Sequence, residues 1–320
     1  MEKPKQQKEV SEMTRRTFLK AVGSGIALSP LSAYLMKEGA MLYQKRDLLL
    51  RTLRQEKTPT SETIEVSRAF LKKEYGVNVY FGDTWDDRGS SMEGVDVIEA
   101  GSSLACLIEE MGKYPPLFFN LNKVTQIRIG KNLYTGNFFR GTREVGGFAR
   151  ARGREMALDI AMGEDFLRGA FHHELHHILD YWHGGDANDE RWEQIHADCT
   201  CKPEIRRTPF DPKNPEFDQS FVNAYGASSP LEERAEFASY MMMPRAHVLL
   251  LERFNMETPE NEAILRRKYD AMKKDFFAWS AGKMDEAYWK ALLAKASVHE
   301  YDADYSDYDS FYYDTFEVQK

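Results

Sequence analysis

Several features are scarce in this chain of 320 residues, and each scarcity excludes a class of protein. Cysteine occurs only three times, and the length together with an apolar content of 42% is enough for a full hydrophobic core, so the chain is not a disulfide-dense mini-scaffold. Positive charge is not in excess, because the formal net charge is −8, and no basic stripe with interleaved aromatic residues occurs. We therefore do not expect a nucleic acid partner. The length fits one large domain or two closely joined lobes, and no internal repeat occurs.

A long apolar run is also missing. The most apolar N-terminal stretch, residues 21–36, is too short and too polar for a membrane span. It follows Thr-Arg-Arg-Thr-Phe-Leu-Lys at residues 14–20, which resembles the twin-arginine export signal. We therefore expect residues 1–40 to be a signal segment and the protein to be exported by the twin-arginine route to the periplasm or outside the cell. If this segment is not cleaved, it would tether the protein to the membrane.

What the chain does contain is a cluster of histidines. Four of its eight histidines lie at positions 172, 173, 176 and 177, inside the apolar run 166–182. Residues 173–177 read His-Glu-Leu-His-His, which is an H-E-x-x-H motif. Side chains four apart on a helix share one face, so His173 and His177 can bind one metal ion, and Glu174 can accept a proton from a water on that ion. The pattern predicts a zinc hydrolase.

A second pair of histidines has the same spacing, because His172 and His176 are also four residues apart. Only the pair His173 and His177 has a glutamate directly after its first member, so we assign the metal to that pair. The alternative is that the histidines form a His-rich exposed helix face or an adventitious metal site.

A catalytic zinc ion needs a third protein ligand and one position that stays open for water. His183 would complete a sequence close to H-E-x-x-H-x-x-G-x-x-H. However, Asp180 stands where that pattern has glycine, and Gly184-Gly185 predict that the helix ends after His183. Asp180, one turn beyond His177, either supports the site from behind the ligands or is an acid on the helix surface.

Glu232 and Glu236 are the other candidates for the third ligand. They follow Ser229-Pro230, a pair that predicts the start of a helix with serine as its N-cap. Ser229-x-x-Glu232 also fits a capping box, in which the glutamate carboxylate binds the backbone N–H of the cap instead of a metal. The residues alone leave His183, Glu232 and Glu236 open.

A second motif accompanies the histidines: Tyr225, Glu232 and Ala235-Glu236 form a Y-x6-E-x-x-A-E element. Together with H-E-x-x-H, this element resembles the anthrax lethal factor and Pro-Pro endopeptidase group, and the zincin-like zinc-binding metallopeptidases of bacteria, over about residues 115–245. The resemblance implies one zinc ion with Glu232 as its third ligand. It also implies that Tyr225 donates a hydrogen bond to the developing oxyanion and that Glu236 braces a ligand histidine.

The order of predicted elements also resembles the zincin fold. By this resemblance we expect an α+β, zincin-like fold with a small twisted sheet and the active-site helix in an N-terminal lobe, followed by a mainly helical C-terminal lobe. Helices are expected at 48–74 with a break at 58–61, and at 102–113, 166–182, 230–254, 260–279 and 284–296. Strands are expected at 77–81, 124–129, 144–150 and 155–160. The metallopeptidase domain is expected at 45–298, with an acidic, tyrosine-rich and disordered tail at 299–320.

Two segments of this outline bear on function. Strand 155–160 is expected to form the sheet edge beside the site, where an extended peptide could add as a further strand. Residues 186–223 are polar and rich in proline, and they are expected to form a long irregular connection.

The three cysteines, Cys106, Cys199 and Cys201, predict at least one disulfide in an exported protein, with an open connectivity and one thiol left over. The cluster of His196, Asp198, Cys199 and Cys201 could instead hold a second metal ion. It lacks C-x-x-C spacing and an obvious fourth partner.

The sequence therefore predicts an exported zinc endopeptidase that hydrolyses peptide bonds with metal-activated water and uses Glu174 as general base. Its expected partner is a peptide or protein substrate. One alternative is a cell-envelope zinc amidase that acts on wall peptides. The other is a non-catalytic, zinc-stabilised binding domain, against which Glu174 argues, because a structural zinc site needs no base.

Overall fold

The computed structural model describes most of the chain. The described residues are 30–55, 59–81, 85–87, 90–137, 141–197, 220–223, 225–255 and 257–295. The chain divides into two units, residues 1–49 and residues 50–320.

In the first unit the described residues are helical and belong to α2, Pro30–Gln55. Among the described residues, no helix combines the length and the apolar character that crossing a membrane requires. The predicted export motif at residues 14–20 and the predicted tail at residues 299–320 lie outside the described residues, so both remain predictions.

The predicted helix break is confirmed, because α3, Ser61–Tyr75, begins after Thr60, whose side chain accepts a hydrogen bond from Thr63 N.

The second unit contains a mixed sheet of seven strands in its described part. The strands are β1 Asn78–Phe81, β2 Trp85–Asp87, β3 Ser90–Glu93, β4 Gln126–Asn137, β5 Gly141–Glu144, β6 Gly147–Arg150 and β7 Glu155–Asp159. The long strand β4 is central: its first half pairs in parallel with β1 and β7, and its second half pairs antiparallel with β3 and β5. Ile127 and Ile129 of β4 are fully buried in the core.

The prediction that strand 155–160 forms the sheet edge is wrong. Strand β7 lies between β4 and β6, and β6 is the edge strand. The burial of the two strands agrees with this order, because four of the five residues of β7 are buried whereas every residue of β6 is only partly buried. Both segments have short apolar patterns, and the local sequence does not specify which of the two pairs with β4.

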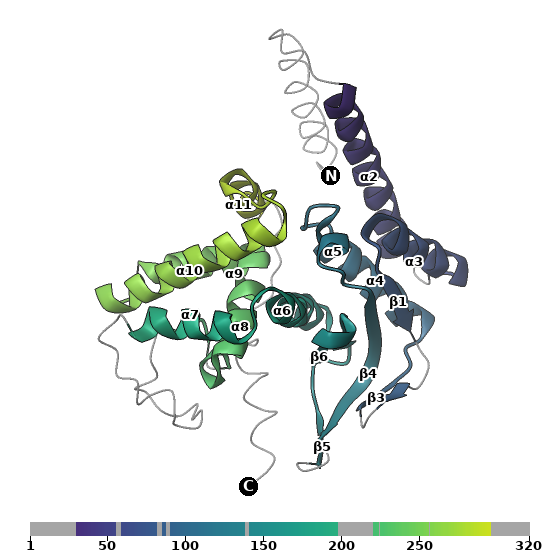
Figure 1. Ribbon diagram of the computed structural model, residues 1–320. Helices are drawn as coiled ribbons and strands as arrows, with labels where there is room; N and C mark the ends of the chain where they lie inside the picture. Colours follow the sequence, from purple (N-terminus) through teal and green to yellow (C-terminus); the bar gives the residue numbers. More distant parts are fainter. Residues whose placement is uncertain are drawn as a thin grey trace, which may run out of the picture. The chain divides into compact units, whose positions relative to one another are not determined.

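Three further helices belong to the N-terminal half of this unit: α4 Val97–Met111, α5 Phe118–Leu121 and α6 Glu164–His183. Helix α4 begins earlier than predicted, because Asp96 and Glu99 form a capping box at its start. Helix α6 carries the H-E-x-x-H motif and packs against α4, α8 (Pro230–Met242), β6 and β7. Figure 1 shows α6 end-on between β6 and α8.

The C-terminal half is helical in its described part. Besides α8, it contains α7 Asp186–Ala197, the 3-10 turn η3 Gly226–Ser228, α9 Pro244–Phe254, α10 Pro259–Trp279 and α11 Glu286–Leu293. The predicted fold class, α+β with a small sheet, a motif-bearing helix and a mainly helical C-terminal part, is confirmed.

Two predictions about this half are wrong. Residues 186–197 form α7 rather than an irregular connection, because Trp192 and Ile195 lie on one face and are buried although the segment is otherwise highly charged. The predicted helix 230–254 is two helices, with Met243 between them in an extended conformation and Pro244 at the start of the second.

Candidate metal centre

Helix α6 places two histidines side by side, one turn apart. The Nε2 atoms of His173 and His177 are 2.9 Å apart, and their rings meet edge to face. The side chain of His173 is 5% exposed and that of His177 is 14% exposed, so the pair lies just below the surface. The helical spacing alone predicts this arrangement.

Helix α8 supplies a carboxylate to the same point. Glu232 Oε2 lies 3.1 Å from His173 Nε2 and 3.3 Å from His177 Nε2. Ser229 is the N-cap of α8 and accepts a hydrogen bond from Glu232 N at 3.2 Å, but the Glu232 carboxylate contacts the histidines. Ser229 therefore caps the helix through the backbone N–H of Glu232, and the Glu232 carboxylate is left for the site.

These three atoms fit the requirements of a metal ion. His173, His177 and Glu232 can each offer one ligand atom, and these atoms all lie within 4.8 Å of one another. Ligand bonds of 2.0–2.1 Å in a tetrahedral site separate neighbouring ligand atoms by about 3.3 Å, close to the three distances given above. Glu232 is 22% exposed, which leaves this side of the site accessible to solvent.

The electrostatics of two of these side chains, His173 and Glu232, also favour a cation at this point. Burial lowers the pKa of His173, but hydrogen bonds to Glu232 and Glu236 outweigh burial and raise it well above its usual value. Burial raises the pKa of Glu232, but hydrogen bonds from His173 and His177 outweigh burial and lower it well below its usual value. The site therefore favours a positive charge between its carboxylate and its imidazoles, and a metal cation would supply this charge.

Glu236 lies one turn after Glu232 on α8, behind His173. Its Oε1 atom is 2.7 Å from His173 Nδ1, and its side chain is fully buried. A proton on Nδ1 donated to this carboxylate leaves the lone pair of Nε2 directed at the candidate ion. Glu236 thus lies against one of the two histidines of the motif, and its role as a brace stays a prediction.

Glu174, the predicted base, is buried at 7% exposure beside the ligands. Burial raises the pKa of its carboxyl, and the positive charges of His173 and His177 partly offset this effect. The backbone of β6 approaches it closely, because a Cβ atom at Gly147 would lie 2.9 Å from Glu174 Cγ and 3.0 Å from Oε1. Gly147 is a site residue that the sequence reasoning missed, and a glycine in the middle of the predicted strand 144–150 was its only signal.

Tyr225, the predicted oxyanion donor, immediately precedes η3. Its ring centroid lies 5.8 Å from that of His173. Burial raises the pKa of Tyr225 well above its usual value, as do the nearby charges of Glu232, Glu174 and Glu236. Its hydroxyl therefore keeps its proton and can act as a hydrogen-bond donor.

Two residues considered for the site lie elsewhere. His183 Nε2 donates to Asn122 Oδ1 at 2.7 Å and its ring stacks on Trp279, so it is not among the ligands. Asp180 is buried and binds Arg234 through both carboxylate oxygens, at 3.1 and 2.6 Å, and Asn188 at 2.8 Å. Asp180 thus joins α6 to α8, where Arg234 lies between Glu232 and Glu236 in the sequence.

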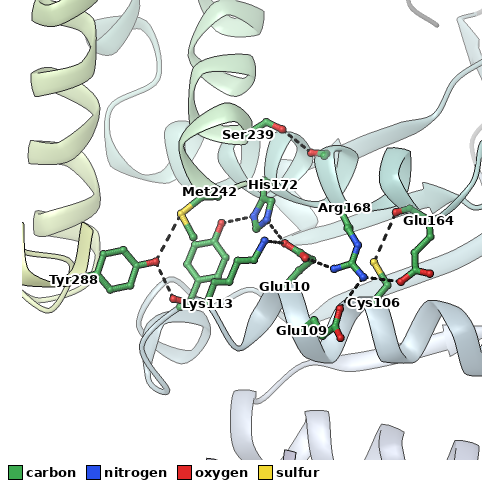
Figure 2. A network of polar contacts seen from close by, with 12 residues as sticks. Cys106, Glu109, Glu110, Lys113, Glu164, Arg168, His172, Ser239, Met242 and Tyr288 are labelled. Carbon is green, nitrogen blue, oxygen red and sulfur yellow. Dashed lines mark hydrogen bonds and ion pairs between the residues drawn. The ribbon is translucent and has the colours of Figure 1, made fainter. Parts of the chain in front are cut away.

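The second histidine pair has other partners, as Figure 2 shows for the first of its members. His172 Nε2 lies 2.6 Å from Glu110 Oε2, and His172 Nδ1 lies 2.8 Å from the hydroxyl of Tyr114. His176 is buried against Trp279, with ring centroids 5.5 Å apart. Within the described part of the chain, the pair His173 and His177 meets a carboxylate that could serve as third ligand, and the pair His172 and His176 does not.

Of the three cysteines, Cys106 lies within the described residues. Cys106 is a buried free thiol whose pKa is raised by burial. Cys199, Cys201 and Asp198 lie outside the described residues, as does the side chain of His196, so the predicted disulfide and the second metal site remain predictions.

Comparisons with known proteins add little. No protein-family model and no curated protein matches the chain. A solved structure from Bacteroides caccae, provisionally named a zinc-binding metallo-peptidase, is 16% identical, has a TM-score of 0.47, and covers 78% of this chain and 98% of its own. A likeness this distant does not indicate the function of this protein.

Proposed function

We propose that this protein is a zinc-dependent endopeptidase. The observation that supports this proposal is the convergence of His173, His177 and Glu232 within 3.3 Å of one another, with a buried glutamate directly after the first histidine. Two imidazoles and one carboxylate are a typical ligand set of catalytic zinc, and three protein ligands leave the fourth position to water. One ion would be bound.

The protein side chains divide the chemistry among them. When bound, zinc would lower the pKa of a water molecule and polarise the scissile carbonyl. Glu174 would accept the proton of that water and later pass it to the leaving amine, a task that suits a carboxyl whose pKa burial raises. Tyr225 would donate a hydrogen bond to the oxyanion, a contribution of about 3 kcal/mol for one such donor.

The substrate would add to the sheet at β6. This strand is an edge strand, and its first residue, Gly147, lies against the proposed base. An extended peptide that pairs with β6 would place its backbone beside Glu174. We therefore propose a peptide or unfolded protein segment as substrate, bound through its main chain.

We further propose that the protein acts outside the cytoplasm, because residues 14–20 match the twin-arginine pattern. Proteins on that route cross the membrane already folded, which suits a protein whose zinc site is assembled from two helices.

The proposal can be tested with the full chain loaded with zinc. A peptide library, an unfolded protein and cell-wall fragments are incubated separately with the enzyme, and the products are identified by mass spectrometry. We expect cleavage inside peptides that a chelator abolishes and added zinc restores. Cleavage of wall fragments alone would indicate an amidase, and zinc binding without any cleavage would indicate a non-catalytic domain.

A further inference from the structure

We propose that Asn223 is a positioning residue that fixes both the brace of a metal ligand and the turn that carries the proposed oxyanion donor. This inference rests on the proposed function, since it concerns the same metal site. Asn223 belongs to neither of the two motifs found in the sequence.

The two ends of the Asn223 amide bind different partners. Its Nδ2 atom donates to Glu236 Oε2 at 2.7 Å, and its Oδ1 atom accepts from Gly226 N at 2.8 Å. Asn223 is 7% exposed and Glu236 is fully buried, so water cannot easily replace either bond.

The first bond completes a chain of contacts that ends at a ligand. Glu236 Oε1 is 2.7 Å from His173 Nδ1, and Asn223 holds the other oxygen of the same carboxylate. A carboxylate held at both oxygens cannot turn about its own axis. Its orientation then fixes the tautomer and the tilt of the His173 ring.

The second bond acts on Tyr225. Gly226 N belongs to η3, so the bond from Gly226 N to the Asn223 side chain closes the turn around Tyr225. A single side chain therefore positions one metal ligand through Glu236 and the oxyanion donor through the backbone.

The segment that carries Asn223 is itself held by helices that supply no ligand. Arg253 Nη1 of α9 donates to Val222 O at 2.8 Å, and Lys268 Nζ of α10 donates to Ser220 O at 2.8 Å. Lys268 is buried and also pairs with Glu233 of α8. The C-terminal helices thus determine where the Asn223 amide lies.

The measurement is the zinc dissociation constant of the folded full chain, obtained by competition with a chromophoric chelator. We expect Asn223→Ala to weaken zinc binding about tenfold, since outer partners of metal ligands typically contribute 10–100-fold. The matched control is Asn122→Ala, which also removes a buried amide (6% exposed), but one whose hydrogen bonds go to Phe118 O, Trp279 O and His183, none of which is a proposed ligand. We expect this control to lower the melting temperature and leave the zinc affinity unchanged.

A double variant tests the route of the effect. If Asn223 acts through Glu236, then Asn223→Ala should not weaken zinc binding further in a Glu236→Ala background. Asn223→Asp is the second variant, which keeps an acceptor for Gly226 N but sets a carboxylate against Glu236. We expect it to weaken zinc binding at least as much as the alanine variant.

Two results would overturn the proposal: wild-type zinc affinity in both Asn223 variants, or additive losses in the double variant. The proposed hydrolase fails separately, if the wild-type protein binds zinc but cleaves no peptide. The zinc affinities would still decide the role of Asn223 in that case.

Discussion

The two histidine pairs of α6 have the same spacing and very different surroundings. His173 and His177 face each other and the carboxylate of Glu232, close to the surface. His172 lies on another face of the helix, where Glu110 and Tyr114 occupy both of its ring nitrogens in the interior. Glu110 is fully buried and is also bound by Lys113 and Arg168.

The comparison teaches that helical spacing makes a metal site possible without creating one. The element that packs against each pair determines whether a metal site forms. Helix α8 places the Glu232 carboxylate beside two ring nitrogens at once. Helix α4 supplies the Glu110 carboxylate, which Lys113 and Arg168 already neutralise. The first carboxylate can exchange its partners for an ion. The second serves to hold α4 against α6.

The largest difference between the two histidine pairs should appear in zinc affinity when one histidine of each pair is replaced by alanine. His173→Ala removes a ligand, and we expect zinc affinity to fall by more than the roughly 10–100-fold that loss of an outer partner costs. His172→Ala should keep near-wild-type zinc affinity and lose about 1–3 kcal/mol of unfolding free energy, because Glu110 and Tyr114 lose a buried partner. Zinc titration and urea unfolding measure the two effects, and equal zinc affinity in both variants would contradict the assignment.

Glu174→Gln should separate catalysis from metal binding on the ligand face. The amide cannot accept a proton, so we expect kcat to fall by about 10²–10⁴-fold while the zinc content stays at the wild-type level. The measurement pairs peptide cleavage with metal analysis. Glu62→Gln on the exposed face of α3 is the control. A fully active Glu174 variant would remove this residue from the mechanism.

The interior face should show a dependence of stability on pH. Burial lowers the pKa of His172 to about 4, although its hydrogen bond and charge interaction with Glu110 oppose this. Above about pH 6.5 the ring is neutral in both states. Between 6.5 and 4 the unfolded chain binds a proton that the folded protein does not bind, so the unfolding free energy falls as the pH falls, by at most about 3 kcal/mol.

His172→Gln tests this dependence, because glutamine can donate to Glu110 and accept from Tyr114 but does not titrate. Urea unfolding in the presence of a chelator at pH 7, 5.5 and 4.5 should show a shallower decline in the variant than in the wild type. Parallel declines would assign the pH dependence to other groups.

The smallest effect is expected at Gly147. The Cβ atom of Gly147→Ala would press on Glu174 at 2.9–3.0 Å, so we expect the base to shift and kcat to fall about tenfold with zinc binding unchanged. Gly153→Ala is the matched control, because a Cβ there lies at an ordinary 3.4 Å from Glu155. Unchanged kcat in the Gly147 variant would show that the base can move without loss.

Most residues of the candidate site could be predicted from the sequence, because they lie in two local sequence patterns. Helical spacing places His173 beside His177, and the position of Glu232 and Glu236 one turn apart follows from the N-cap at Ser229. That the two patterns meet in space came from a resemblance, since nothing in the local sequence states which helices pack together.

What could not be predicted depends on such long-range packing. The order of β7 and β6 follows from strand pairing, and α7 forms because Trp192 finds a buried partner in Glu233. Asn223 lies in a segment with no helical or strand pattern, and its role arises only where three helices meet. Gly147 is recognisable only from the side chain that lies against it.

The buried pair of Asp180 and Arg234 has a consequence for the handling of the ion. It joins α6 and α8 through groups that are each 1% exposed, and it does so without the help of a ligand atom. The cation would therefore be able to leave and return while the polypeptide stays folded. Depletion and reloading should be fast and reversible, unlike in small zinc fingers, whose chain unfolds when the ion is withdrawn.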